Sequence, residues 1–349
     1  MKSNHTAVHT QLKRAGWVEP VREGRSCFIG IDFGKTNVRF ALAGDQPELK
    51  YFTKRRYERG SWKAMQRQIF SGIDETLKEA GYERGELQGI GIDVPAVVNR
   101  ETGVVLWGPD WDFMAGASLT QPVAQRYGVP VVADVDTITP TWAEQWAGVG
   151  KSCRRFAILT WGTGLGAGLV LDGKVQEFPD NLFPEFGHSR VSDDDWPCAC
   201  GSRGCVNALV CGVGIAKHGR LAVEAGGPTR LRDLCGQDPA LVTAPMVFDA
   251  ADQGDAAAKA IVERVSVLLG RLCANIVLTV QPEKIVIVGG LAERTGPVLG
   301  KINQTMREGC WLITKGLTHC EVVCSELGDR AGVLGAIRKV QLITGGNKK

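Results

Sequence analysis

Apolar residues fall in short runs that alternate with longer stretches of helical spacing. The stretch 26–43 (SCFIGIDFGKTNVRFALA) places a polar centre between two apolar runs, which predicts a strand, a glycine turn and a second strand. The stretch 155–171 (RFAILTWGTGLGAGLVL) has the same pattern. This weak internal duplication predicts two similar domains with a cleft between them.

Along the rest of the chain, predicted strands alternate with predicted helices. Apolar runs predict strands that begin at residue 87 and end near Pro95, and strands over 129–133, 284–288 and 321–324. Helical spacing predicts helices over 62–80, 119–127, 139–147, 255–280 and 331–342. The chain is therefore expected to be an α/β protein. We expect an N-terminal arm over 1–25, a first domain over 26–145 that the last helix (331–345) rejoins, and a second domain over 146–330.

Charge and composition exclude few classes of protein. The 349 residues include 41 basic and 38 acidic ones, a balance that does not favour a nucleic-acid partner. The longest apolar runs have the length of strands and are too short to span a membrane. The start of the chain does not resemble a signal peptide. These features lead us to expect a cytoplasmic protein.

Two glycine turns that follow strands are candidate phosphate-binding loops. Glycine lets backbone N–H groups approach phosphate oxygens closely. The first turn offers Asp32, Gly34, Lys35 and Thr36, and the second offers Gly162, Thr163 and Gly164. A plain hairpin turn explains either one alone, but two equivalent turns favour phosphate binding. Lys35 either contacts phosphate or is solvated.

Two further strand ends carry candidate residues. Gly289 and Gly290 end the run IVIVGG, where small residues would let the backbone approach a flat ring, although a simple turn is the alternative. The run VVADVDT leads into Asp134 and Asp136. A carboxylate there could act as a general base in a cleft. Helix capping or a solvated loop is the alternative reading of these acids.

A group of thiols indicates a metal site. His188 and three cysteines follow the pattern H-x9-C-x-C-x4-C, and Gly201 and Gly204 permit sharp bends between them. The ligands would be His188, Cys198, Cys200 and Cys205. Three thiolates and one imidazole suit a closed, structural zinc site. The chain has eleven cysteines, an odd number, and we expect the others to be reduced.

Taken in order, these motifs resemble the ROK family (repressor, open reading frame, kinase). DFGKT, GTGLGAG and VIVGG resemble its two phosphate loops and its adenosine segment, and EFGH followed by CACGSRGC resembles its ExGH and CxCGxxGC signature. The resemblance covers about residues 26–342 and implies a two-domain, actin-like (ribonuclease H-like) ATPase fold. It implies ATP with Mg²⁺, structural zinc and, in many relatives, a homodimer.

The resemblance also implies a sugar kinase. Asp134 matches the catalytic aspartate, which would take a proton from a sugar hydroxyl as that oxygen attacks ATP. Glu185 and His188 match positions that contact the sugar.

The acceptor half of the family pattern is altered. The residues that depart from it, or adjoin a departure, are Pro95, Ala96, Asp110, Ala133 and Asn207. This chain has Ala133 where the family pattern has an asparagine. It has Asn207 where the family has a glutamate that contacts the sugar near its anomeric carbon. A site lacking these groups favours an unusual acceptor, such as an amino sugar or a C7-cyclitol.

The resemblance leaves two other functions to consider for this chain, a repressor and a sugar sensor. A repressor of this family carries a helix-turn-helix region before the core, and only about 25 residues precede the first expected strand here. A catalytically dead sugar sensor would explain Ala133 and Asn207, but both phosphate loops and Asp134 are present. We therefore expect a kinase of a hexose-like polyol.

Overall fold

The computed structural model describes residues 25–108, 111–178, 181–294 and 296–345. The expected arm, apart from Arg25, and Asp110 lie outside these residues. Contacts divide the chain into two units, each described by itself below. Unit 1 holds residues 1–148, 177–182 and 329–349, and unit 2 holds residues 149–176 and 183–328. Within the described ranges, no helix is long and apolar enough to cross a membrane.

The core of unit 1 is a five-stranded sheet in the order β3-β2-β1-β4-β7. Its strands are β1 (Cys27–Phe33), β2 (Asn37–Ala43), β3 (Leu49–Arg56), β4 (Leu87–Val94) and β7 (Val131–Val135). In this order, β2 is antiparallel to both β3 and β1, and β1, β4 and β7 run parallel. The strand–turn–strand predicted over 26–43 is confirmed. A short hairpin of β5 (Val97–Val98) and β6 (Val105–Trp107) follows β4.

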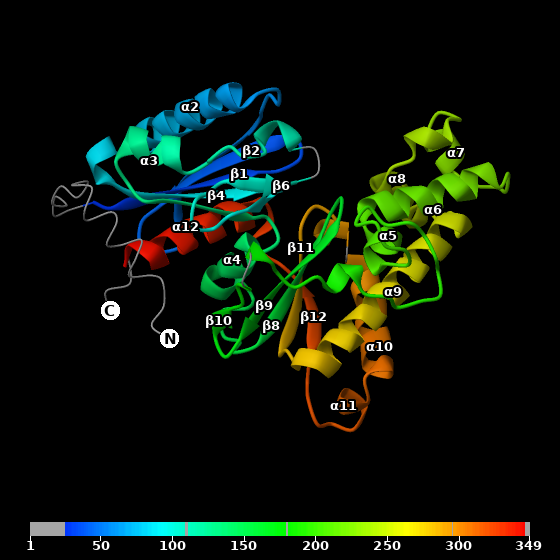
Figure 1. The fold of residues 1–349 in the computed structure, drawn as a ribbon. Coiled ribbons are helices and arrows are strands. Elements are labelled where there is room, and N and C mark those ends of the chain that lie inside the picture. Colours follow the sequence, from blue (N-terminus) through cyan, green and yellow to red (C-terminus); the bar gives the residue numbers. More distant parts are fainter. Residues whose placement is uncertain (1–24, 109–110, 179–180, 295, 346–349) are drawn as a thin grey trace. The chain divides into compact units, whose positions relative to one another are not determined.

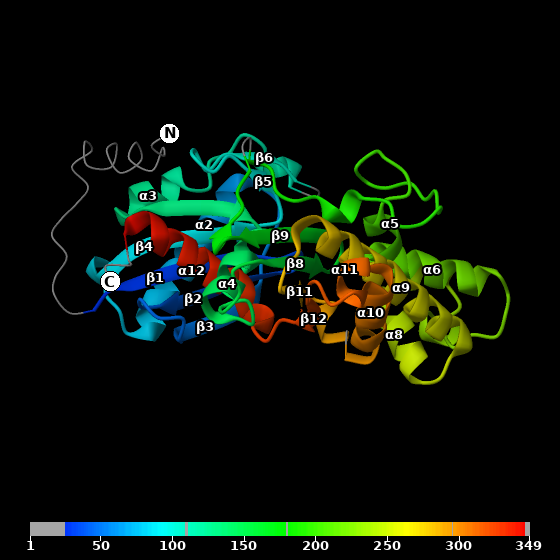
Figure 2. The ribbon, with the colours of Figure 1, turned by 90° about the horizontal axis from the view of Figure 1, so that it is seen from below.

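Helices cover both faces of this sheet. On one face lie α2 (Trp62–Ala80) and α3 (Gln121–Tyr127), and on the other lie α4 (Thr139–Ala147) and α12 (Ala331–Thr344), as Figures 1 and 2 show. The predicted helix over 62–80 is confirmed, with Ser61 accepting the amide hydrogen of Ala64 and Gly81 in the left-handed conformation. Both features are ordinary helix-end signals.

Glycines bring α12 close to the sheet. A Cβ on Gly30 would lie 2.2 Å from the carbonyl oxygen of Val333, and one on Gly91 would lie 2.0 Å from that of Ala336. Any side chain at either strand position would push the helix away. The last helix therefore packs directly on the backbone of β1 and β4, next to the strand ends that carry aspartates.

Unit 2 repeats this topology. Its sheet has the order β10-β9-β8-β11-β12, again three antiparallel strands followed by parallel ones. The strands are β8 (Phe156–Trp161), β9 (Leu165–Leu171), β10 (Lys174–Val175), β11 (Lys284–Val288) and β12 (Glu321–Cys324). The equal strand orders agree with the duplication inferred from the two hairpin patterns.

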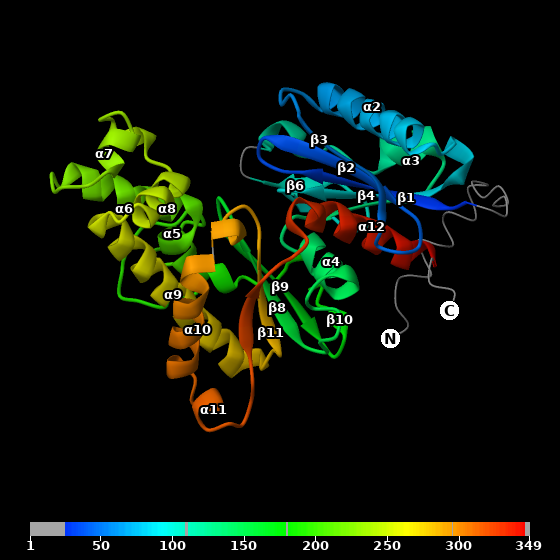
Figure 3. The same ribbon diagram turned by 180° about the vertical axis from the view of Figure 1, so that it is seen from behind.

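The helices of unit 2 include one long pair. The 25-residue α9 (Ala256–Val280) packs along α10 (Gly296–Gly309), as Figure 3 shows. The shorter helices are α5 (Val206–Val210), α6 (Gly212–Glu224), α7 (Leu231–Leu234), α8 (Ala244–Asp252) and α11 (Trp311–Thr314). The segment 177–182, which lies between two parts of unit 2 along the chain, makes its contacts with unit 1.

Candidate functional site

Three aspartates stand side by side on the parallel strands of unit 1. Asp32 on β1 pairs in register with Asp93 on β4, which pairs in register with Asp134 on β7. Residues in register on neighbouring strands point to the same face of a sheet. A Cβ on Gly332 of α12 would lie within 2.8 Å of both the Asp32 and the Asp93 carboxyl groups. The row therefore lies under α12.

Asp32 and Asp93 differ in whether a cation contacts the carboxyl group, although burial raises the pKa of both. Asp32 accepts a 3.0 Å hydrogen bond from Arg39, but burial outweighs that cation and raises the pKa of Asp32 to about 6. Burial, with the negative charges of Asp32 and Asp136, raises the pKa of Asp93 well above its ordinary value. Among the described residues, Asp93 Oδ1 has no hydrogen-bond partner. Burial and these neighbouring charges therefore favour the neutral form of Asp93.

Asp134 is buried and fully engaged. Its Oδ1 accepts hydrogen bonds from the Val135 amide (2.9 Å) and from Arg100 Nε (3.2 Å), and its Oδ2 accepts one from Lys339 Nζ. Burial alone would raise the pKa of Asp134, but Lys339 and Arg100 outweigh it and lower the pKa. A carboxylate with a lowered pKa and both oxygens engaged is a poor proton acceptor.

Asp136 contrasts with Asp134 only two residues away. It follows β7, its amide donates to the Val94 carbonyl (2.9 Å), and its side chain is exposed. Desolvation by surrounding protein atoms and the negative charge of Asp32 raise the pKa of Asp136 to about 7. An exposed carboxyl group with this pKa is suited to general-base chemistry at neutral pH.

The first glycine turn is held by its own unit. Gly34 donates to the Asn37 carbonyl (2.9 Å), and the Tyr57 hydroxyl donates to the Gly34 carbonyl (2.9 Å). Arg59 donates to the carbonyl of Lys35. The side chains of Lys35 and Thr36 are exposed. The turn therefore has a fixed backbone and exposed side chains next to Asp32.

The residues predicted to contact an acceptor differ in exposure. Pro95 is half-buried, and Ala96 is only 2% exposed. Ala133 is 1% exposed and packs in the core between the sheet and the α2–α3 face. Its side chain therefore lies on the opposite side of β7 from Asp134 and cannot contact a ligand there.

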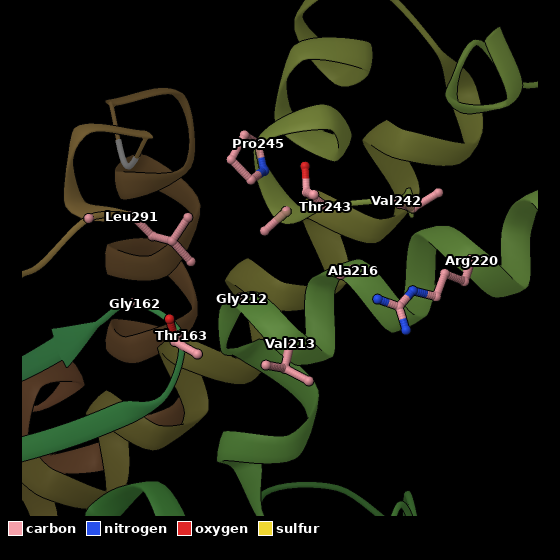
Figure 4. Close-up of a pocket in the computed structure, with 12 residues that line it drawn as sticks. Gly162, Thr163, Gly212, Val213, Ala216, Arg220, Val242, Thr243, Pro245 and Leu291 are labelled. Carbon is pink, nitrogen blue, oxygen red and sulfur yellow. The ribbon is translucent and has the colours of Figure 1, made fainter. Parts of the chain in front are cut away.

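The second candidate glycine turn, at Gly162 to Gly164, lies in unit 2 and borders a pocket of about 350 Å³ (Figure 4). Gly162 and Thr163 lie at one end of it, and the Gly212 amide at the start of α6 donates to the Gly162 carbonyl (2.8 Å). The rest of the lining is mostly apolar. It comes from α6, from the start of α8 with the residues before it, and from the segment after β11: Val213, Ala216, Arg220, Val242, Thr243, Ala244, Pro245, Gly290 and Leu291. The size and lining suit a flat ring carrying a polar group at one end.

Gly289 and Gly290 follow β11 next to the pocket, and glycine serves a different purpose at each position. Gly289 has a φ of 103°, and a Cβ there would lie 2.8 Å from the Trp161 carbonyl oxygen. That same carbonyl accepts the Leu291 amide (3.0 Å). Gly290 lines the pocket, and a Cβ there would meet nothing within 4 Å. Glycine is therefore required at 289, whereas at 290 it leaves the pocket open.

The predicted zinc ligands of unit 2 come together. One ligand atom from each of His188, Cys198, Cys200 and Cys205 lies within 4.8 Å of the others. Cys198 Sγ is 3.6 Å from His188 Nδ1, and Cys200 Sγ is 3.7 Å from Cys205 Sγ. A tetrahedral zinc with bonds of about 2.3 Å separates its ligands by roughly 3.8 Å. These four residues, the Cys/His cluster, therefore fit zinc in both donor set and spacing.

Two further candidates adjoin the Cys/His cluster. Glu185 Oε2 lies 3.6 Å from His188 Nε2. Asn207 Oδ1 accepts the Leu165 amide (2.7 Å), and Asn207 Nδ2 lies 3.7 Å from Cys198 Sγ as a donor. Both polar atoms of the Asn207 side chain are therefore used inside unit 2. The sequence pattern predicts a substrate contact for Asn207.

The fold, the two glycine turns and the Cys/His cluster together define a class of protein. It is a duplicated α/β chain in which each unit carries a glycine turn after its first strand. Comparison with known proteins gives the family. The ROK family model matches residues 28–341. The glucokinase of Thermotoga maritima is 31% identical over 321 residues, which cover 91% of this chain and 98% of that protein. The xylose repressor of Caldicellulosiruptor bescii is 27% identical and covers 89% of this chain and 77% of that one.

A solved structure confirms the fold class. The ROK glucokinase of Streptomyces griseus, solved in complex with glucose and AMPPNP, has a TM-score of 0.77 at 24% identity, covering 91% of this chain and all of that one. The chain described here belongs to the ROK family. It has the actin-like, two-domain α/β ATPase fold that the sequence motifs predicted.

Proposed function

We propose that this protein is an ATP-dependent kinase that phosphorylates a primary hydroxyl group of a hexose-like acceptor. The observation that carries the proposal is the exposed carboxyl group of Asp136, whose pKa is raised to about 7 beside Asp32. The glycine turn and pocket of unit 2 support nucleotide binding. Membership of a family that includes glucokinases supports a sugar acceptor.

In this proposal the general base is Asp136 and not Asp134, to which the sequence motif assigned the role. Asp136 takes the proton of the acceptor hydroxyl while that oxygen forms a bond to the γ-phosphorus of ATP. The bond from the γ-phosphorus to the ADP oxygen breaks, and ADP leaves with the electron pair. Asp134 holds the end of β7 in place through its ion pairs. The family asparagine before the base then corresponds to Val135, an apolar residue.

The chemistry of this site also fits a magnesium ion. Mg²⁺ prefers oxygen ligands and commonly keeps several waters, so the Asp32 carboxylate suits it directly or through water. When bound, the ion would neutralise phosphate charge. In unit 1, backbone N–H groups of the turn at Gly34 would contact phosphate oxygens. In unit 2, the turn at Gly162 to Gly164 offers backbone N–H groups of the same kind, and the apolar pocket beside Gly290 would take the adenine ring.

The nature of the acceptor follows from what the chain lacks. Asn207 stands where the family pattern has a glutamate near the anomeric carbon, and both its polar atoms are already bonded. The place before the proposed base is Val135, which is also apolar. Such a site gives little recognition of an anomeric hydroxyl group. We therefore favour an amino sugar or a C7-cyclitol, with Glu185 and His188 as contacts.

The proposal also covers the oligomeric state and the partners of the protein. We expect a homodimer, and we expect no nucleic-acid partner even though relatives include DNA-binding repressors. Retained binding of ADP and sugar without turnover would instead identify a sensor.

An ADP-release assay tests the proposal. Purified protein with Mg-ATP is offered glucose, mannose, N-acetylglucosamine, N-acetylmannosamine, kanosamine and the C7-cyclitols valiolone and valienone. We expect turnover with one acceptor class, well above hydrolysis of ATP alone. No turnover with any of these acceptors, while the protein binds ADP, would contradict a kinase of this substrate class.

A further inference from the structure

Asn207 joins two parts of unit 2 that are separate in sequence. Its carbonyl oxygen accepts the Leu165 amide at 2.7 Å, where the second glycine turn enters β9. Its amide nitrogen donates to Cys198 Sγ at 3.7 Å, within the sulfur hydrogen-bond range. One half-buried side chain therefore lies between the Cys/His cluster and the turn beside the pocket.

The residue type fits this double role. The turn needs an acceptor, because the Leu165 amide points at residue 207. A thiolate ligand of a metal needs a donor, and an N–H···S bond from a neighbouring residue orients and stabilises such a ligand. An amide side chain offers both groups, whereas an ionised glutamate, the residue of the family pattern, can only accept.

The backbone around Asn207 strengthens the connection. Cys205 precedes α5 by one residue, and α5 leads directly to Gly212, whose amide donates to the Gly162 carbonyl (2.8 Å). The turn is also closed by the bond from the Gly162 amide to the Gly164 carbonyl (2.9 Å). Two residues that follow Cys205 in sequence therefore hold the turn: Gly212 bonds to Gly162, and Asn207 bonds to Leu165.

We propose that Asn207 is a positioning residue that couples zinc at the Cys/His cluster to nucleotide binding at the Gly162–Gly164 turn. With zinc bound, Cys198 is fixed as a thiolate, Asn207 is oriented by it, and the Leu165 amide holds the turn in its phosphate-binding shape. This inference rests on the proposed nucleotide site. Coupling of this kind is reciprocal, so bound nucleotide should also hold the zinc more tightly.

The test measures zinc release from the loaded, full-length protein. A chromophoric chelator reports the rate of zinc transfer with and without saturating Mg-ADP, and calorimetry gives the ADP affinity. In the unchanged protein we expect ADP to slow zinc transfer about tenfold, a coupling of ordinary size. In Asn207→Ala we expect most of that slowing to disappear and ADP to bind about fivefold more weakly, as for the loss of a hydrogen bond.

Two further variants make the result specific. Asn207→Asp keeps the acceptor for Leu165 but loses the donor to Cys198, so it should also lose the effect of ADP on zinc transfer. Asn275→Ala, at an exposed position of α9, should behave as the unchanged protein. Circular dichroism checks that each variant is folded.

The outcomes separate this inference from the function on which it rests. If the unchanged protein binds ADP but its zinc release does not respond, the coupling is refuted and the nucleotide site stands. If Asn207→Ala or Asn207→Asp keeps the full response, Asn207 is not the connection. If the unchanged protein does not bind ADP at all, the proposed nucleotide site itself fails, and the coupling fails with it.

Discussion

Lys339 of α12 and Asp134 of β7 form a buried ion pair within unit 1. The Lys339 ammonium group also donates to Glu177 Oε1 at 2.5 Å, and only 9% of its side chain is exposed. Burial alone would lower the pKa of Lys339, but the two carboxylates outweigh it and raise the pKa. Lys339 therefore joins the last helix to Asp134 of β7 and to Glu177.

Removing Lys339 should strongly destabilise unit 1. In Lys339→Met, Asp134 and Glu177 keep Arg100 Nε at 3.2 and 3.8 Å but lose the buried ammonium group that both contact. Breaking a buried pair in this way typically costs about 3–5 kcal/mol. Urea denaturation should show this loss, and adding Asp134→Asn should restore part of it. Lys301→Met is the matched control, because Lys301 pairs with Glu263 at the surface and should change stability by less than about 1 kcal/mol. Equal effects of the two lysine variants would contradict a structural role for the buried pair.

This ion pair shows where sequence reasoning stops. Lys339 and Asp134 are 205 residues apart, and no local pattern connects them. The hairpin turns, α2 and the strand ends are encoded locally by glycine, apolar spacing and capping residues, and the sequence predicted them. The β3 strand was missed because its side chains alternate between half-buried and exposed, without a buried apolar run.

The choice between Asp134 and Asp136 has the same physical origin. Both are acids near the end of an apolar strand, and spacing along the chain does not tell which of them meets a buried lysine. The hydrogen bonds of Asn207 were not predictable for a related reason, because its partners Leu165 and Cys198 come from other segments. The Cys/His cluster was predictable, since four ligands lie within 18 residues of sequence and glycines with φ of 90° and 73° make the bends.

Close packing of α12 predicts a second effect on stability. A Cβ on Gly335 would lie 1.8 Å from the Thr139 carbonyl oxygen, so Gly335→Ala must displace α12 from α4. We expect a loss of at least about 2 kcal/mol in thermal or urea unfolding. Gly300→Ala in α10, where a Cβ meets nothing within 4 Å, should stabilise by up to about 1 kcal/mol. A neutral Gly335→Ala would mean that the helix does not pack as described.

The Cys/His cluster predicts a metal content. Elemental analysis of protein purified without chelators should give about one zinc per chain, and Cys205→Ser should give much less, with a lower melting temperature. Cys324→Ser, at a half-buried cysteine of β12 outside the cluster, should keep its zinc. Zinc-free protein of unchanged melting temperature would contradict a structural metal site.

The raised pKa of Asp136 predicts the pH dependence of the reaction. A base with a pKa of about 7 is protonated, and therefore inactive, below that pH. The value of kcat/KM for the acceptor should therefore rise with pH through about 7 and fall roughly tenfold per pH unit below it. A profile that stays flat down to pH 5 would show that a carboxyl group of ordinary pKa, or none, is the base.

The most direct test of the account compares Asp136→Asn with Asp134→Asn, using the acceptor that supports the greatest ADP release. We predict that Asp136→Asn lowers kcat at least about a hundredfold while ADP still binds. We predict that Asp134→Asn keeps most of its turnover and loses stability instead. If Asp136→Asn turns over as the unchanged protein does, or if folded Asp134→Asn alone is inactive, Asp136 is not the base.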